Sequence, residues 1–296
     1  MASFTDFIAS KKYVILSGAM GTELQRRGYE TRLPLWSAQA NLDAPELVRQ
    51  IHEDYIKAGT DLLTTNTFRT QPYTFQKVRR RPLASEATKN AVQAILRAKK
   101  SADRDVFAGG ELAPLEDCYL PDLIPEDSIL EEEHFSQAKL LASLGVDFLF
   151  CETINSIREA LIMIRAAKST GLPFMISFLV NPQGDLLNGE SLKKVIDRVA
   201  VFHPVGILLN CRPIDIINQG IDSLCRYYSG VKGVYPNGIG KPADDLGWTF
   251  SGEGDNIVKF VEFCERWYKQ GVKILGGCCG TTPEYIKALS KRMAML

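Results

Sequence analysis

Three cysteines have the residue type and the placement that a metal centre requires. Cys211 ends one short apolar run, and the adjacent pair Cys278-Cys279 follows another, between Gly276-Gly277 and Gly280. Adjacent side chains of a regular strand point in opposite directions, but the flanking glycines allow the backbone to bend until both sulfurs face one ion. Three thiolates can bind zinc and leave a fourth position open, which is typical of a catalytic zinc site.

A zinc ion with three thiolate ligands is electron-rich, so it activates water poorly but suits a fourth thiol. A free thiol has a pKa of about 8.5, and binding to the zinc ion would remove its proton while the sulfur stays nucleophilic. The implied reaction is attack of a substrate thiolate on an alkyl carbon, with zinc as activator and template. Two other interpretations remain open, namely buried thiols without a metal and a strained disulfide between the neighbours.

The remaining chemistry-bearing side chains are weaker candidates for metal ligands. Seven cysteines are an odd number, which is not typical of a disulfide framework in a chain of this length. Four of them are expected in the core or in loops: Cys118, Cys151, Cys225 and Cys264. No ligand function is expected for the three histidines, which are His52, His134 and His203.

The elements that would position these cysteines alternate between strands and helices. Eight short apolar runs, each near Gly, Pro or Asp, are predicted strands: residues 13–17, 62–65, 105–108, 147–151, 174–178, 205–210, 233–235 and 272–276. Helical periodicity is found in residues 45–58, 131–144, 157–169 and 256–270.

Alternation of this kind predicts βα units and a parallel sheet. Eight strands in 296 residues are roughly 37 residues per unit, which fits a (β/α)8 TIM barrel formed by residues 1–296 as a single domain. A doubly wound open sheet is the structural alternative. Residues 113–126, which contain three prolines, are expected to form a long surface loop.

In a barrel the functional groups lie on the loops at the carboxyl ends of the strands. Cys211, Cys278 and Cys279 all fall at such positions, after predicted strands six and eight. The other polar or glycine-rich candidates at that edge are Gly18, Ala19, Met20, Asn66, Glu111, Glu152, Asn210 and Asn237.

Composition excludes several classes of partner. Thirty-five basic residues balance thirty-five acidic ones, which argues against binding to nucleic acid or to an anionic membrane. No apolar run approaches the roughly 18 residues of a membrane span, and the amino-terminal apolar patch is too short and interrupted for a signal peptide. We therefore expect a cytoplasmic protein that acts on small molecules.

These motifs closely resemble the homocysteine S-methyltransferase family. That family includes enzymes that use S-methylmethionine or S-adenosylmethionine, betaine–homocysteine methyltransferase, and the homocysteine domain of cobalamin-dependent methionine synthase. The matching segments run in family order over nearly the whole chain: residues 18–24, 66–68, 151–153, 210–211, 235–237 and 276–281. The resemblance implies a (β/α)8 barrel with zinc on Cys211, Cys278 and Cys279, and homocysteine as the fourth ligand.

The resemblance also implies how the amino acid would be held. Glu152 should bind the homocysteine ammonium, because a carboxylate near the buried end of a strand needs a cationic partner. A salt bridge from Glu152 to a Lys or Arg of the protein is the alternative. The backbone of Gly18, Ala19 and Met20 could donate N–H groups to the carboxylate, or form only a tight turn. Three asparagines could position substrate or stabilise turns: Asn66, Asn210 and Asn237.

Two positions depart from the family pattern. Ser17 stands where the family commonly has Asp, and Glu111 stands where many relatives have a small Ser or Gly. We hypothesise that Glu111 supplies the negative charge that is missing at Ser17, since both would point into the mouth of the barrel.

The sequence thus predicts a zinc-dependent methyltransferase that converts homocysteine to methionine, a step of methionine biosynthesis. S-methylmethionine or S-adenosylmethionine is the expected donor, and no catalytic residue beyond the zinc site is expected. Betaine is less expected. Betaine enzymes of the family have a carboxyl-terminal extension for oligomerisation, whereas this chain stops at Leu296, soon after the expected last helix of the barrel. The alternatives are a homocysteine module that accepts methyl from a separate corrinoid protein, and a non-catalytic zinc or thiol sensor.

Overall fold

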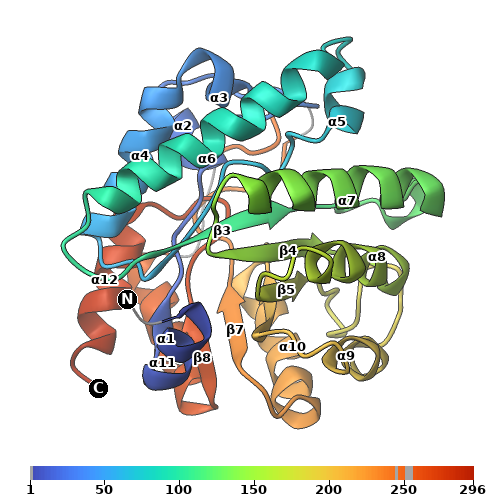
Figure 1. Ribbon diagram of the computed structural model, residues 1–296. Coiled ribbons are helices and arrows are strands. Elements are labelled where there is room, and N and C mark those ends of the chain that lie inside the picture. The colour runs from blue at the N-terminus through green and yellow to red at the C-terminus, as the bar shows by residue number, and fades with distance from the viewer. Residues whose placement is uncertain (1–2, 244–245, 251–255) are drawn as a thin grey trace.

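Eight parallel strands form a barrel at the centre of this computed structural model, which describes residues 3–243, 246–250 and 256–296 (Figure 1). The strands are β1 (Val14–Ile15), β2 (Leu62–Thr64), β3 (Phe107–Leu112), β4 (Phe148–Ile154), β5 (Phe174–Phe178), β6 (Gly206–Asn210), β7 (Lys232–Tyr235) and β8 (Val272–Leu275). Their hydrogen-bonded order is β1-β8-β7-β6-β5-β4-β3-β2. A parallel bridge between Leu16 and Leu62 joins the first strand to the second and closes the ring.

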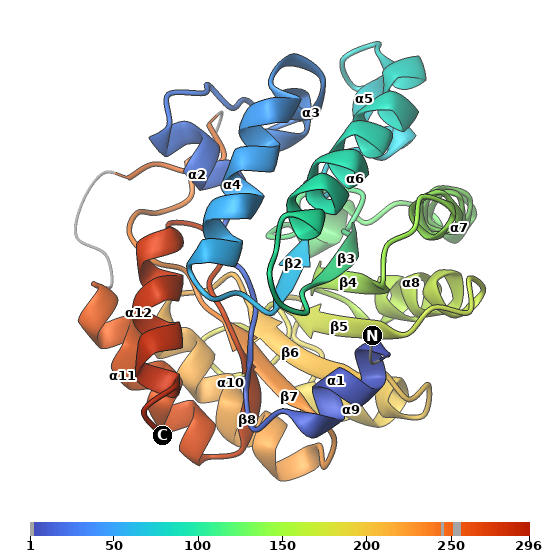
Figure 2. The same ribbon diagram turned by 60° about the vertical axis from the view of Figure 1, so that its left-hand side comes forward.

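Helices surround the barrel, as Figure 2 shows. The longer ones are α4 (Pro45–Lys57), α6 (Ala84–Lys100), α7 (Asp127–Ser143), α8 (Ile157–Lys168), α9 (Leu192–Ala200), α10 (Ile214–Tyr227), α11 (Ile257–Lys269) and α12 (Pro283–Met293). Four shorter helices are α1 (Phe4–Ser10), α2 (Gly21–Arg26), α3 (Ala40–Asp43) and α5 (Pro72–Gln76). The predicted (β/α)8 barrel is therefore confirmed.

Local sequence accounts for where several helices begin. Ser156, Ser191 and Asn256 precede α8, α9 and α11, and each side chain accepts a hydrogen bond from the backbone N–H three residues later. Such caps satisfy N–H groups that have no partner inside the helix. Helix α4 instead starts at Pro45, whose ring fixes a helical φ where no N–H is needed.

All eight predicted strands are present, but two of them end later than predicted. Strand β3 continues to Leu112 and β4 to Ile154, so Glu111 and Glu152 lie within strands and not after them. The pairing of Glu111 with Phe150 and of Leu112 with Cys151 carries β3 past its predicted end. The sequence predicts that the strands end before Glu111 and Glu152, but Glu111 is paired within β3, and Glu152 lies in β4 where the pairing with β5 changes register.

The other boundaries follow the sequence closely, with two exceptions. Helix α7 begins at Asp127 and not near residue 131. The segment 113–126 is only in part a surface loop, because Leu115 and Cys118 are buried. Side chains of the next βα unit hold it: Glu159 accepts the Leu115 N–H at 3.1 Å, and Asn155 donates to the Cys118 carbonyl at 2.7 Å.

The amino end of the barrel is closed by α1. The Phe4 ring stacks on Phe148 with a centroid distance of 4.2 Å, and Phe7 packs against Phe107 at 4.8 Å. Phe107 and Phe148 are the first residues of β3 and β4, so α1 covers the end where these strands begin. The carboxyl ends of the strands are left for the loops that could carry function. Within the described residues, no helix is long and apolar enough to cross a membrane.

Replacing Phe4 with Ala tests whether α1 is a structural plug. Phe4 is 4% exposed, so its loss removes a stacked ring and leaves a cavity. We expect Phe4→Ala to lower the free energy of unfolding by about 3 kcal/mol in urea titrations. Thr5→Ala, on the exposed side of the same helix, is the control. A loss for Phe4→Ala no larger than for the control would contradict the plug.

Candidate active site

A pocket of about 410 Å³ lies at the carboxyl ends of the strands. The loops after β1, β2, β6 and β8 contribute to its wall, and β3 and β4 contribute residues near their carboxyl ends. Ser17 lines the pocket, and so do nine of the predicted site residues: Gly18, Ala19, Met20, Asn66, Glu111, Glu152, Cys211, Cys278 and Cys279.

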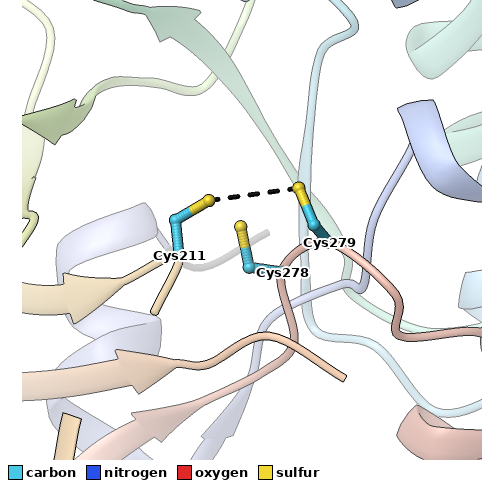
Figure 3. Close-up of side chains that lie close together, drawn as sticks. All are labelled: Cys211, Cys278 and Cys279. Carbon is cyan, nitrogen blue, oxygen red and sulfur yellow. Dashed lines mark hydrogen bonds between the residues drawn. The ribbon is translucent and has the colours of Figure 1, made fainter. Parts of the chain in front are cut away.

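The structure brings the three predicted thiols together. The sulfur atoms of Cys211, Cys278 and Cys279 all lie within 4.8 Å of one another, and those of Cys211 and Cys279 are 4.0 Å apart (Figure 3). Two sulfurs on one tetrahedral zinc ion lie about 3.8 Å apart, given Zn–S bonds of about 2.3 Å. The spacing of the trio therefore fits a shared metal ion with little movement.

Backbone conformation explains how the sulfurs converge. Cys211 directly follows β6 with a φ of 54°, which turns its side chain away from the strand ladder. Gly280 has a φ of 78°, and a Cβ on it would lie 2.1 Å from the Ile239 carbonyl oxygen. The loop is fixed on its other side, because the Cys278 N–H donates to the Pro236 carbonyl at 2.7 Å. Glycine at position 280 is thus required for both adjacent sulfurs to reach Cys211.

The three thiols are not electrostatically equivalent. Hydrogen bonds from Cys278 and Cys279 hold the pKa of Cys211 well below its usual value. The contact with Cys211 raises the pKa of both partners, and burial raises it further. Cys211 is therefore the sulfur that carries negative charge most readily, which favours the approach of a cation.

A pair of buried carboxyl groups lies in the same pocket. Glu111 and Glu152 are 9% and 7% exposed, and their carboxyl groups are hydrogen-bonded to each other. Glu152 also accepts a hydrogen bond of 2.9 Å from the Tyr235 hydroxyl. Neither glutamate has a Lys or Arg within 4.0 Å in the described part of the chain. The salt bridge considered for Glu152 from the sequence is therefore absent among these residues.

Burial dominates the protonation of this pair. Burial raises the pKa of Glu152 well above its usual value, and the neighbouring charge of Glu111 raises it further. Burial also raises the pKa of Glu111, although hydrogen bonds from Glu152, Thr64 and the backbone N–H groups of Thr67 and Phe68 oppose this. Two such groups share a proton when alone, and a cation between them would replace it.

The glycine-rich turn after β1 lines the pocket as predicted. The backbone comes close to its neighbours here, since a Cβ on Gly18 would lie 2.7 Å from the Tyr55 hydroxyl. The Ala19 N–H already donates to the Thr281 hydroxyl at 3.3 Å. Among the described residues, no partner accepts from the N–H groups of Gly18 and Met20, so these two are available to an anionic ligand group.

The three predicted asparagines have mainly structural contacts. Asn66 lines the pocket, but its amide donates to the Ser37 carbonyl and to Asn41. Asn210 is fully buried and donates to the Thr153 hydroxyl at 2.8 Å. Neither Asn210 nor Asn237 is among the residues that line the pocket. A substrate contact for these three stays a prediction.

Sequence reasoning missed several residues of the pocket wall. The Tyr119 hydroxyl donates to the Cys211 carbonyl at 3.0 Å and lies 3.3 Å from the Cys211 sulfur. Cys118 packs in the same cluster as Cys211, and Arg69 and Trp36 also line the pocket. Tyr119 and Cys118 were missed because the segment 113–126 was expected on the surface. Arg69 directly follows the predicted motif of residues 66–68. Its position next to that motif was the sequence signal that could have identified it.

Comparison with known proteins places the chain among homocysteine methyltransferases. Residues 14–293 match the family described as Homocysteine S-methyltransferase. Homocysteine S-methyltransferase 2 of Arabidopsis thaliana is 28% identical, and the match covers 98% of this chain and 96% of that protein. Selenocysteine Se-methyltransferase of Brassica oleracea var. italica is 26% identical over 95% and 89%.

One solved structure shows the same fold. The metallated form of the homocysteine methyltransferase MmuM from Escherichia coli superimposes with a TM-score of 0.83 and is 24% identical. The match covers 97% of this chain and 98% of that one.

Serine substitutions test which thiols bind a metal. We expect Cys211→Ser, Cys278→Ser and Cys279→Ser each to lose stoichiometric zinc in metal analysis after dialysis, because three thiolates supply the affinity. Cys118→Ser is the matched control, since Cys118 is equally buried beside Cys211 but lies outside the trio. Loss of zinc from the Cys118 variant, or its retention in the other three, would contradict this assignment.

Proposed function

The chain belongs to the homocysteine S-methyltransferase family, and from this we propose that its pocket transfers a methyl group from an onium donor to homocysteine, forming methionine. The single observation that supports the proposal is the joint presence, in one pocket, of three convergent thiols and a buried carboxyl pair that has no cationic partner among the described residues. The three thiols can hold a metal ion that binds a substrate thiol, and the carboxyl pair can bind an ammonium group. Homocysteine carries both groups.

Zinc is the metal that the donor set fits best, and Cys211, Cys278 and Cys279 are the residues that would hold it. Three thiolates are soft ligands, and their spacing matches a tetrahedral ion. A zinc ion bound there supplies the acidity that keeps an incoming thiol deprotonated near neutral pH. The chain contributes the position of this centre, which is open toward the pocket and closed toward the barrel interior by the buried core.

The acceptor would be held at its ammonium and at its carboxylate. Glu111 and Glu152 bind the ammonium between them, which replaces the shared proton with a full positive charge. Gly18 and Met20 line the pocket, and their N–H groups, which have no acceptor among the described residues, would bind the carboxylate. Holding both groups fixes the direction of the acceptor sulfur, which is the main catalytic contribution expected from the protein.

The donor would be a small onium compound. Aromatic side chains line the pocket near the thiols, among them Trp36, Phe68 and Tyr119, and their ring faces attract a positively charged centre. The leaving group becomes neutral when the methyl group departs, so no general acid is required. A pocket of about 410 Å³ is near the small end of the usual range of about 300–1,000 Å³, which favours S-methylmethionine over the larger S-adenosylmethionine.

A donor comparison tests this proposal. With zinc-loaded protein and homocysteine, we expect methionine formation with S-methylmethionine to exceed that with S-adenosylmethionine, betaine or methylcobalamin by at least about tenfold in kcat/KM. Cys278→Ser is the control and should abolish turnover. Turnover with methylcobalamin alone would instead support the homocysteine module that accepts methyl from a corrinoid protein. Zinc binding with no turnover would support the sensor.

Removing one charge of the carboxyl pair tests the acceptor site. We expect Glu111→Gln to raise the KM for homocysteine about tenfold with a much smaller change in kcat, because one charge-assisted hydrogen bond is lost. Glu126→Gln, at an exposed position before α7, is the matched control. An unchanged KM in the Glu111 variant would show that Glu111 does not replace the charge missing at Ser17.

A further inference from the structure

The pocket contains one buried cation that the proposed acceptor does not use. Arg69 follows β2 and is 8% exposed. Among the described residues that line the pocket, it is the only lysine or arginine. The described residues place no carboxylate within 4.0 Å of its guanidinium group. Burying a charge without a counterion is costly, so a residue of this kind is expected to meet an anionic partner supplied by a ligand.

Arg69 is held in place by one hydrogen bond and one ring contact, and most of its donors have no partner in the described part of the chain. Its Nη1 donates to the Glu116 carbonyl at 3.2 Å, and its guanidinium lies 5.4 Å from the centre of the Phe68 ring. A guanidinium has five N–H donors in a fixed fork, so several remain for a carboxylate. The fork matches a carboxylate in a bidentate arrangement, which a lysine cannot reproduce.

The surroundings of Arg69 connect it with the donor half of the pocket. Phe68, on which it packs, is in edge contact with Trp36 at 6.5 Å, and these two rings belong to the wall proposed to face the onium group. Glu116, which fixes Arg69, lies in the segment that also carries Tyr119 beside the Cys211 sulfur. The acceptor carboxylate is already assigned to the N–H groups of Gly18 and Met20, for which the described residues offer no acceptor.

We propose that Arg69 binds the carboxylate of the methyl donor and so makes the protein selective for zwitterionic onium donors. This inference rests on the proposed function, since it assigns a second substrate to the same pocket. It adds a specificity-determining residue that the proposed acceptor contacts do not use. The donor class it names is an onium compound that carries a carboxylate, and not a simple sulfonium or ammonium ion.

The test compares two donors that differ only in the carboxylate. S-methylmethionine carries it, and (3-aminopropyl)dimethylsulfonium lacks it. We expect the wild-type protein to use the first at least about tenfold better in kcat/KM. Arg69→Gln should lower kcat/KM for S-methylmethionine about 10- to 100-fold, mainly through KM, and change it for the second donor by less than about threefold. Arg69→Lys should recover part of the loss.

Two readouts separate this function from a structural one. The KM for homocysteine and the zinc content of Arg69→Gln should equal those of the wild type, because Arg69 touches neither the thiol trio nor the carboxyl pair in the described contacts. An equal loss with both donors would overturn the proposal in favour of a packing role. A rise in the KM for homocysteine alone would overturn it in favour of the acceptor carboxylate.

Failure of the proposed function would be recognised separately. If no donor is turned over, calorimetric titration of zinc-loaded protein with S-methylmethionine and with (3-aminopropyl)dimethylsulfonium still measures binding. Tighter binding of the carboxylated compound that disappears in Arg69→Gln would support Arg69 as a carboxylate receptor even then. Equal binding of the two compounds to the wild-type protein would overturn the proposal.

Discussion

Three sulfur atoms from two separate strand ends must meet at one point, and the rest of the pocket depends on that constraint. Strand β7 lies between β6 and β8, so Cys211 reaches the Cys278-Cys279 pair only across an intervening strand end. The left-handed backbone at Cys211 and at Gly280 makes this possible. The loops that carry Cys211 and the Cys278-Cys279 pair follow β6 and β8. The hydrogen-bonded pairing of β7 with both strands fixes the distance between these two loops. A less rigid scaffold would not keep three thiols within reach of one ion.

Buried charged groups of both signs line the pocket that contains the thiols. The pair Glu111 and Glu152 is anionic or shares a proton, whereas Arg69 is a buried cation without a carboxylate partner in the described residues. Buried charges of both signs are costly unless a ligand completes them. The arrangement is therefore suited to two zwitterionic substrates, because the carboxyl pair suits the ammonium of the acceptor and Arg69 suits the carboxylate of the donor. Selectivity follows from the cost of leaving either charged group unpaired.

The sequence was sufficient for the barrel and for the thiol trio, but not for the whole pocket. Repeated strand and helix patterns are local, so all eight strands could be predicted, and the glycines around Cys278 and Cys279 indicated a sharp turn. The ends of β3 and β4 could not be predicted, because they depend on pairing between strands: Glu111 pairs with Phe150, and Glu152 lies where the pairing of β4 with β5 changes register before it resumes at Ile154. Tyr119 and Arg69 were missed for a similar reason, since their importance arises from contacts across the fold.

X-ray absorption at the zinc edge tests most directly whether the trio leaves one position for the acceptor thiol. We predict three sulfur neighbours at about 2.3 Å and one lighter neighbour for zinc-loaded protein alone. Addition of homocysteine should raise the sulfur count to four, and selenohomocysteine should instead add one selenium neighbour. Four sulfur neighbours before homocysteine is added, or no change after it is added, would contradict the account.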